Sequence, residues 1–236
     1  MAHGNTPRHL ILLGAIWSYL LLLIPPILKL ISTKFREREN GVQSQTLTFR
    51  DTNASRSIWI HASSLGEFEQ ARPIIENVKK RNPHIDVTVT FFSPSGYRIR
   101  HNYEYANRVL YLPLDTKGNA MSFIQHIKPD IILFIRYELW LNYLLEAKKQ
   151  AIPVYAVNAT FPRSSLWRLF PGILKSIIQL FSGIYTVNSV ETHSFASLNA
   201  DVPVYDGHDT RIDRIHEKVS IMRTNHVMIN ELLPGF

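Results

Sequence analysis

The chain has 236 residues, of which 45% are hydrophobic and 19% are charged, an ordinary composition for a globular protein that argues against extended disorder. Cysteine is absent, which excludes a disulfide framework, a thiolate nucleophile and a Cys-based metal site. The ten histidines show no HxH or HExxH spacing, so we predict no metal site. A formal charge of +7 and a pI near 9.6 favour an anionic partner.

The N-terminal segment, residues 1–36, is predicted to be a hydrophobic membrane anchor with a basic flank. Residues 10–28 contain no charged side chain, and four basic side chains follow by residue 38. A cleaved signal peptide is disfavoured because the run is long and no Ala-x-Ala-like site follows it. Two alternatives stay open: a spanning helix kinked at Pro25-Pro26, or an anchor in one leaflet with its basic flank on anionic headgroups. The basic flank favours the cytoplasmic side.

Residues 37–57 are polar and without periodicity, which predicts a linker. From residue 58 onward, short apolar runs rich in branched residues alternate with amphipathic patterns. The predicted strands are 58–62, 86–92, 109–112, 131–135, 153–157, 183–187 and 202–205. The predicted helices are 67–81, 95–105, 117–127, 139–150, 166–180 and 190–199.

This alternation predicts an α/β fold, a Rossmann-like parallel sheet with helices on both faces, over residues 58–207. The run "IILFI" at 131–135 is apolar at every position, as expected of a central strand. Ligands of such sheets bind at the carboxyl ends of the strands. After residue 207 the alternation stops, and 208–236 is predicted to be a linker remnant and tail.

The stretch "SSLGE" follows the first predicted strand and opens a helix. Ser64 and Glu67 have the spacing of a capping box, a structural role that the spacing alone favours. Gly66 is unexplained by that role, because glycine in a helix costs up to about 1 kcal/mol relative to alanine. A ligand approaching the backbone would explain it. Glu67 would then be placed to accept a proton from a substrate hydroxyl, with the helix N-terminus holding its carboxylate ionised.

Glu138 occupies the equivalent place after the strand at 131–135. The ordinary explanation is an acid at a helix start or a surface pair with Arg136. Two acids at strand ends on one edge of a sheet nevertheless favour a catalytic cleft.

The segment "FFSPSGYRIR" ends another strand with small residues, including Ser95 and Gly96. These residues suit either an anion or a tight turn with Ser95 as the helix N-cap. The sequence has no GxGxxG after the first strand, no GxxxxGK[ST] and no GxSxG, so neither a nucleotide-binding loop nor a serine-hydrolase elbow is predicted. No RRM or zinc-finger pattern is present either, and we predict no nucleic-acid partner.

Six segments taken together resemble the N-terminal half of the Kdo (3-deoxy-D-manno-octulosonic acid) transferase family. They are "HASSLGEFEQARPII", "TFFSPSGYRIR", "YLPLDTKGNA", "IILFIRYELWLN", "IPVYAVNA" and "DTRIDRI". The resemblance runs in order from Ile58 to Ile215. It implies the acceptor-binding domain of a GT-B glycosyltransferase that moves Kdo from CMP-Kdo to lipid A, with inversion and with neither metal nor cofactor.

The resemblance also implies roles for individual residues. Glu67 matches the acid proposed as the base, Glu138 matches a second functional glutamate, and Gly66 matches the motif glycine. The candidate substrate-binding residues are Ser64, Gly66, Ser95, Gly96 and Arg136.

In the family the "DTRIDRI"-like segment leads into a second domain that binds CMP-Kdo. We expect that donor-binding domain to be absent from this chain. The expected partners are a lipid A precursor and a membrane, and the expected location is the cytoplasmic face of the inner membrane. Two alternatives remain: a non-catalytic membrane-bound module for an anionic lipid or sugar, and a GT-B transferase that uses another nucleotide sugar.

Overall fold

The computed structural model of the protein describes residues 7–47, 54, 56–136, 138–163, 169–207, 209 and 210, apart from the side chains of 24–27, 30 and 31. All seven predicted strands are present, with bounds that differ from the prediction by a residue or two, so the α/β prediction is confirmed. The strands are β1 (Ser57–His61), β2 (Asp86–Phe91), β3 (Arg108–Tyr111), β4 (Ile131–Ile135), β5 (Val154–Ala159), β6 (Gly183–Thr186) and β7 (Val204–Tyr205).

The strands form one parallel sheet in the order β3-β2-β1-β4-β5-β6-β7. The order reverses between β1 and β4, which are neighbours in the sheet although β2 and β3 separate them in the chain. Ligands of doubly wound sheets bind in the crevice at the carboxyl ends of the strands beside such a reversal. Glu67 and Glu138 follow β1 and β4, so both predicted acids lie at this switch point.

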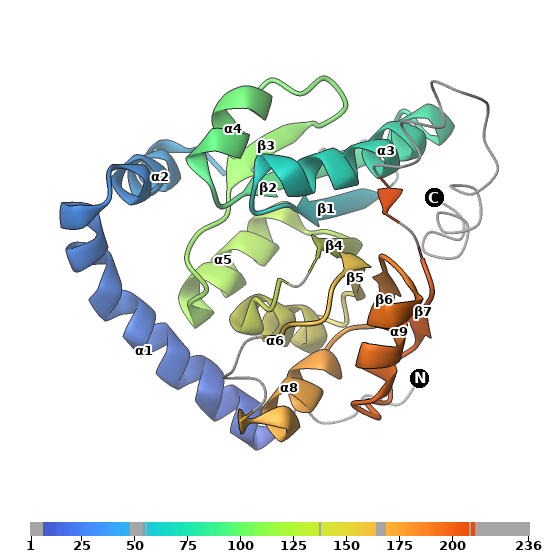
Figure 1. Cartoon of the computed structure of the whole chain (residues 1–236). Helices are drawn as coiled ribbons and strands as arrows, with labels where there is room; N and C mark the ends of the chain where they lie inside the picture. The colour runs from blue at the N-terminus through green and yellow to red at the C-terminus, as the bar shows by residue number, and fades with distance from the viewer. Residues whose placement is uncertain are drawn as a thin grey trace.

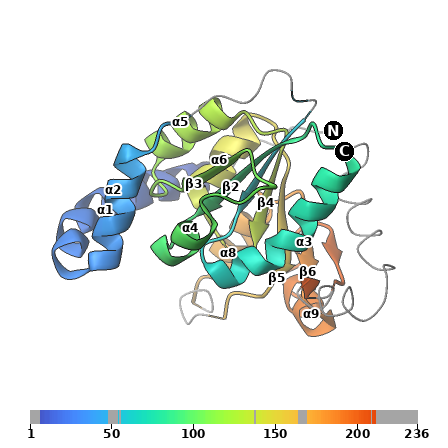
Figure 2. The same cartoon turned by 90° about the horizontal axis from the view of Figure 1, so that it is seen from above.

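Helices cover both faces of the sheet, as Figures 1 and 2 show. One face carries α3 (Leu65–Arg81) and α4 (Pro94–Arg100), and the other carries α5 (Lys117–Ile127), α6 (Leu141–Lys149) and α8 (Pro171–Ile178). Helix α9 (Ser189–Ala196) packs beside β6 and β7 at the end of the sheet. Each predicted helix is therefore present, although α4 and α8 are shorter than predicted.

Alternate side chains of the strands fill two separate cores. Trp59 is fully buried on the α5 and α6 face, with its ring centroid 5.0 Å from that of Phe123 and 5.5 Å from that of Tyr143. Its neighbours Ile58 and Ile60 are buried in the core on the α3 face. Every residue of β1, β2 and β4 is buried, and the central strand β4 is accordingly apolar at every position.

Helix α1 (Arg8–Ile31) lies along one side of the molecule, against α5, α6 and α8 (Figure 1). Leu10 is fully buried there, and His9 lies 3.1 Å from the Ser176 hydroxyl of α8. In the part of the chain that the structure describes, no helix combines the length and the apolar character needed to cross a membrane. The predicted hydrophobic anchor is therefore not supported by the structure.

The linker predicted for residues 37–57 is wrong over its first part, because α2 spans Thr33–Ser44. The helix has no apolar stripe and was missed for that reason. It is fixed instead by Arg38, which is buried and donates to the backbone carbonyl of Leu112, with its guanidinium 4.0 Å from the centre of the Phe92 ring. The Gln45 side chain adds two hydrogen bonds to the backbone of Tyr111 in β3, the edge strand of the sheet.

Most of the predicted tail at 208–236 lies outside the described residues, but Asp209 and Thr210 are described. Thr210 is fully buried, and its hydroxyl donates to the Gln70 carbonyl and accepts from the Asn158 amide, both at 2.6 Å. The Gln70 side chain also donates to Asp209 at 3.3 Å. The chain after β7 is thus attached to α3 one turn from Glu67.

Candidate active site

The loop after β1 forms the capping box that its sequence predicts. The Glu67 carboxylate accepts a hydrogen bond from the Ser64 amide at 3.0 Å through Oε2, and the Ser64 hydroxyl accepts from the Glu67 amide at 3.5 Å. The Ser63 amide also acts on this carboxylate and lowers its pKa. The cap therefore fixes the Glu67 side chain at the start of α3.

Glu67 is only 8% exposed, and burial raises its pKa above the ordinary value. The Ser64 amide and the positive charge of Arg136 lower the pKa but do not offset the burial. The helix N-terminus was expected to hold this carboxylate ionised, and burial acts on its pKa in the opposite direction. A raised pKa brings a carboxylate closer to the neutral range in which a general base works best.

Among the described residues, none crowds the position that a side chain at Gly66 would take. A Cβ built on it would have the Ser64 hydroxyl, 4.0 Å away, as its nearest neighbour, and Gly66 itself is exposed. Its backbone is not in the left-handed region either. The described residues therefore give no reason for the glycine, and the approach of a ligand to this turn stays a prediction.

The end of β4 carries the second acid on an unusual backbone. Arg136 has a φ of 69°, in the left-handed region that few residues other than glycine adopt, and strain of this kind is concentrated at functional sites. Glu138 follows it. The pKa of Glu138 is raised to about 7, first by burial and then by the negative charge of Glu67, although Ser63, Trp140 and Arg136 act to lower it.

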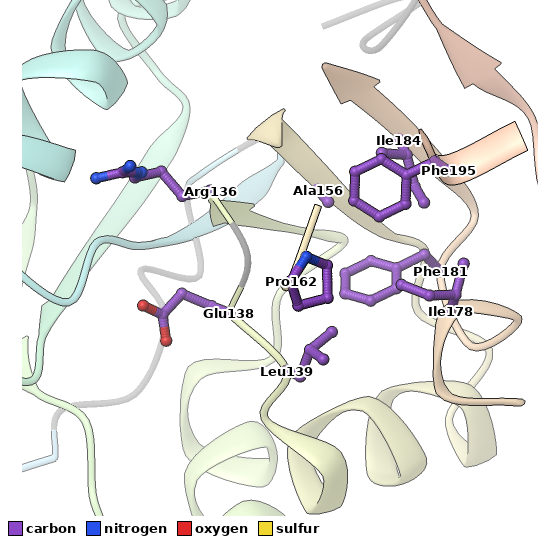
Figure 3. A pocket seen from close by; sticks show the side chains of 9 residues that line it. All are labelled: Arg136, Glu138, Leu139, Ala156, Pro162, Ile178, Phe181, Ile184 and Phe195. Carbon is purple, nitrogen blue, oxygen red and sulfur yellow. The ribbon is translucent and has the colours of Figure 1, made fainter. Parts of the chain in front are cut away.

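The electrostatic interactions of these residues show that they lie near one another at the switch point. The negative charge of Glu67 raises the pKa of Glu138, and the positive charge of Arg136 lowers the pKa of both carboxyl groups. Figure 3 shows the Arg136 and Glu138 side chains extending to the same side, away from the apolar residues that line the pocket behind them. That pocket encloses only about 10 Å³, close to the space of one water, so it is packing behind the site rather than a ligand cavity.

Ser95 and Gly96 do not behave alike. Ser95 is exposed beyond β2, and its hydroxyl lies 2.8 Å from that of Ser93, whose amide donates to the Ser63 carbonyl at 2.7 Å. Gly96 is buried, and a Cβ there would lie 2.4 Å from the Phe91 ring. The glycine is explained by the close packing of α4 on β2, not by the anion contact predicted for it.

Three residues of this region were not predicted. The Ser63 hydroxyl lies 3.0 Å from Nε2 of His61, and the Trp140 ring packs edge-on against His61 at 5.1 Å. Burial lowers the pKa of His61 to about 3, so this histidine is neutral at physiological pH and is no candidate base. Ser63 stands beside the motif "SLGE" and Trp140 two residues after Glu138, so proximity in sequence was the available signal.

The site so described is two carboxyl groups with raised pKa values, one arginine and several hydroxyl groups, at the switch point of a doubly wound sheet. Among the described residues, no group of three or more His, Cys, Asp or Glu side chains is placed to hold a metal ion. Such a site suits proton transfer to or from a hydroxyl of a polar substrate. The class that the fold and site define is therefore an α/β enzyme domain with two acids at the switch point of its sheet.

Comparison with known proteins identifies the family within this class. The family described as 3-deoxy-D-manno-octulosonic-acid transferase (Kdo transferase) matches residues 33–214, and the chain belongs to it. It is thus a member of a glycosyltransferase family. The match includes α2, which agrees with the packing of that helix on the domain.

Relatives in several organisms share this similarity. The chain is 30% identical over 125 residues to a 3-deoxy-D-manno-octulosonic acid transferase of Haemophilus influenzae, a match of 52% of this chain and 29% of that protein. It is 31% identical over 145 residues to the transferase of Rickettsia bellii, covering 60% of this chain and 34% of the relative. The chain therefore spans about a third of the length of these curated relatives.

Solved structures support the fold alone. A UDP-N-acetylglucosamine 2-epimerase superposes with a TM-score of 0.52 and 18% identity, covering 73% of this chain and 53% of that chain. The UDP-GlcNAc 2-epimerase of Neisseria meningitidis gives a TM-score of 0.50 and 18% identity, covering 76% of this chain and 54% of the other.

Proposed function

We propose that this chain is the acceptor-binding, base-carrying domain of a Kdo transferase, which acts on lipid A with CMP-Kdo as the donor. Glu67 removes the proton of a lipid A hydroxyl, and that oxygen attacks the anomeric carbon of Kdo. The bond from this carbon to the phosphate of CMP breaks with its electron pair, and CMP leaves from the opposite face, so the configuration inverts. Neither a metal nor a cofactor is required by this scheme.

The observation that carries the proposal is the convergence of Glu67 and Glu138 at the switch point, with an open Gly66 turn beside them. The cap holds the Glu67 carboxylate at the start of α3, and its raised pKa suits a base. Glu138, with a pKa of about 7, can hold a proton near neutral pH and donate a hydrogen bond to the substrate. Arg136 supplies positive charge for an anionic substrate.

The domain is also proposed to work at a membrane surface, on the cytoplasmic face of the inner membrane. The outer side of α1 supports this, because its large apolar side chains are between 44% and 71% exposed. They are Ile11, Leu12, Ile16, Trp17, Tyr19, Leu20, Leu22 and Leu23. A helix lying along a bilayer buries such side chains at the boundary between headgroups and acyl chains.

The direct test supplies the chain with a Kdo transferase donor-binding domain, CMP-Kdo and a lipid A precursor in vesicles, and detects the product by mass spectrometry. Formation of Kdo-lipid A is the expected result. Binding of the lipid without any transfer would instead favour a non-catalytic module for an anionic lipid or sugar, a function favoured by the engagement of Glu67 in a helix cap. Transfer only from another nucleotide sugar would replace the proposed donor.

A further inference from the structure

Helix α6 begins immediately after the segment that carries Glu138, and it has no side-chain cap of its own. Its N-cap residue is Trp140, which makes no capping hydrogen bond through its side chain. A carboxylate from a distant loop takes that place. Oδ1 of Asp115, in the loop between β3 and α5, accepts from the backbone amides of Asn142 at 3.0 Å and Tyr143 at 3.3 Å.

Further contacts hold this Asp115 cap together. The Asn142 side chain donates back to the Asp115 carbonyl at 2.6 Å, and the Tyr143 hydroxyl donates to the Pro113 carbonyl at 3.1 Å. Asp115 is 2% exposed, and burial raises its pKa to about 7 although the amides of α6 lower it. Burial of a carboxyl group costs free energy unless hydrogen bonds compensate it. The amides at the start of α6 supply these bonds, so the helix start is held where it can donate to Asp115.

Helix α1 closes the cap from outside. A Cβ on Gly14 of α1 would lie 2.9 Å from Oδ1 of Asn142, so the two helices touch at this point. Near it, the Ser18 hydroxyl accepts from the amide of Lys117, two residues after Asp115. The cap is thus enclosed by three segments that are far apart in the sequence.

We propose that Asp115 is the positioning residue for Glu138. Only the five residues 136–140 separate the end of β4 from the start of α6, so fixing the first turn of α6 restricts where Glu138 can lie relative to Glu67. The role of this positioning in catalysis rests on the proposed function. The position and the pKa of Glu138 can be measured whether or not that function is correct.

The test is the titration of Glu138 in the chain itself, followed by NMR of carbon-13-labelled glutamate carboxyl groups, with no donor and no transfer reaction. In Asp115→Ala the first turn of α6 loses its acceptor and Glu138 gains access to water. Its pKa is expected to fall from about 7 by at least about one unit, toward the ordinary glutamate value. In the transfer assay the same variant is expected to lower kcat rather than raise KM.

Asp130→Ala is the matched control. Asp130 also accepts from a distant backbone amide, that of Ser57 at 2.8 Å. This bond lies at the amino end of β1, whereas the candidate site lies at the carboxyl ends of the strands. In Asp130→Ala the pKa of Glu138 should stay at its wild-type value. If Asp115→Ala does not fold, Asn142→Ala removes the 2.6 Å side-chain bond and the contact with Gly14 but keeps both backbone bonds to Asp115, and it should give a smaller fall in the same direction. An unchanged Glu138 pKa in the folded variants, or an equal fall in the control, would overturn the proposal.

Discussion

Glu67→Gln is expected to reduce Kdo transfer by about 10²–10⁴-fold in the chain supplied with a donor-binding domain, because the acceptor hydroxyl loses its general base. Glutamine keeps an oxygen that can accept from the Ser64 amide, so the capping box and the fold should survive. Lipid binding should change little. The measurement is the initial rate of Kdo-lipid A formation at saturating acceptor.

Glu69→Gln supplies the control for this experiment. Glu69 lies two residues further along α3, where its carboxylate pairs with Arg100 at 2.6 Å and with Arg72 at 3.7 Å. The same chemical change on the same helix should leave transfer near the wild-type rate. Undiminished transfer by Glu67→Gln would remove Glu67 as the base and leave it as a helix cap.

The second large effect is expected from Gly66→Val. Apart from its chain neighbours and the backbone of its own helix, no described atom lies closer than 4.0 Å to the built Cβ, so the free energy of unfolding should stay within about 1 kcal/mol of the wild type. The added methyl groups occupy the space in which the acceptor is proposed to lie. Displacing a substrate by about 1 Å can cost on the order of 10²-fold, and a loss of transfer of that size is expected.

Gly96→Val serves as the comparison, because it is expected to lower stability, whereas Gly66→Val is expected to lower transfer. Its Cβ would meet the Phe91 ring at 2.4 Å and the backbone nitrogen of Leu65 at 3.1 Å. Overpacking of this kind typically costs about 1–3 kcal/mol, which urea unfolding would detect. Full transfer by Gly66→Val would show that the open turn is not where the substrate lies.

The fold was largely predictable because its strands are buried on both faces. Continuous apolar runs such as 131–135 mark the sheet regardless of the details of packing. Helix α2 was not predictable in this way, because its stability comes from the buried Arg38 and its contacts with Phe92 and Leu112 rather than from a periodic apolar face. Hydrophobic periodicity carries no information about such contacts.

The two acids were predictable for a different reason. Residues that directly follow parallel strands meet at one edge of the sheet, so Glu67 and Glu138 could be paired from the strand assignments alone. The role of Gly96 was not, since a small residue after Ser-Pro-Ser suits an anion and a tight packing contact equally well. Asp115 was missed because its partner Asn142 is 27 residues away, and only the folded chain brings them together.

The proposal as a whole requires that Glu67 and Glu138 share one crevice, and the pKa of Glu138 in Glu67→Gln tests this most directly. The carboxyl group should titrate near 7 in the wild type, and lower in the variant, because part of the rise comes from the negative charge of Glu67. Burial still acts in the variant, so the pKa should remain above the ordinary glutamate value. A Glu138 pKa that is the same in both proteins would contradict the account, because it would place the two carboxyl groups too far apart to interact in one site.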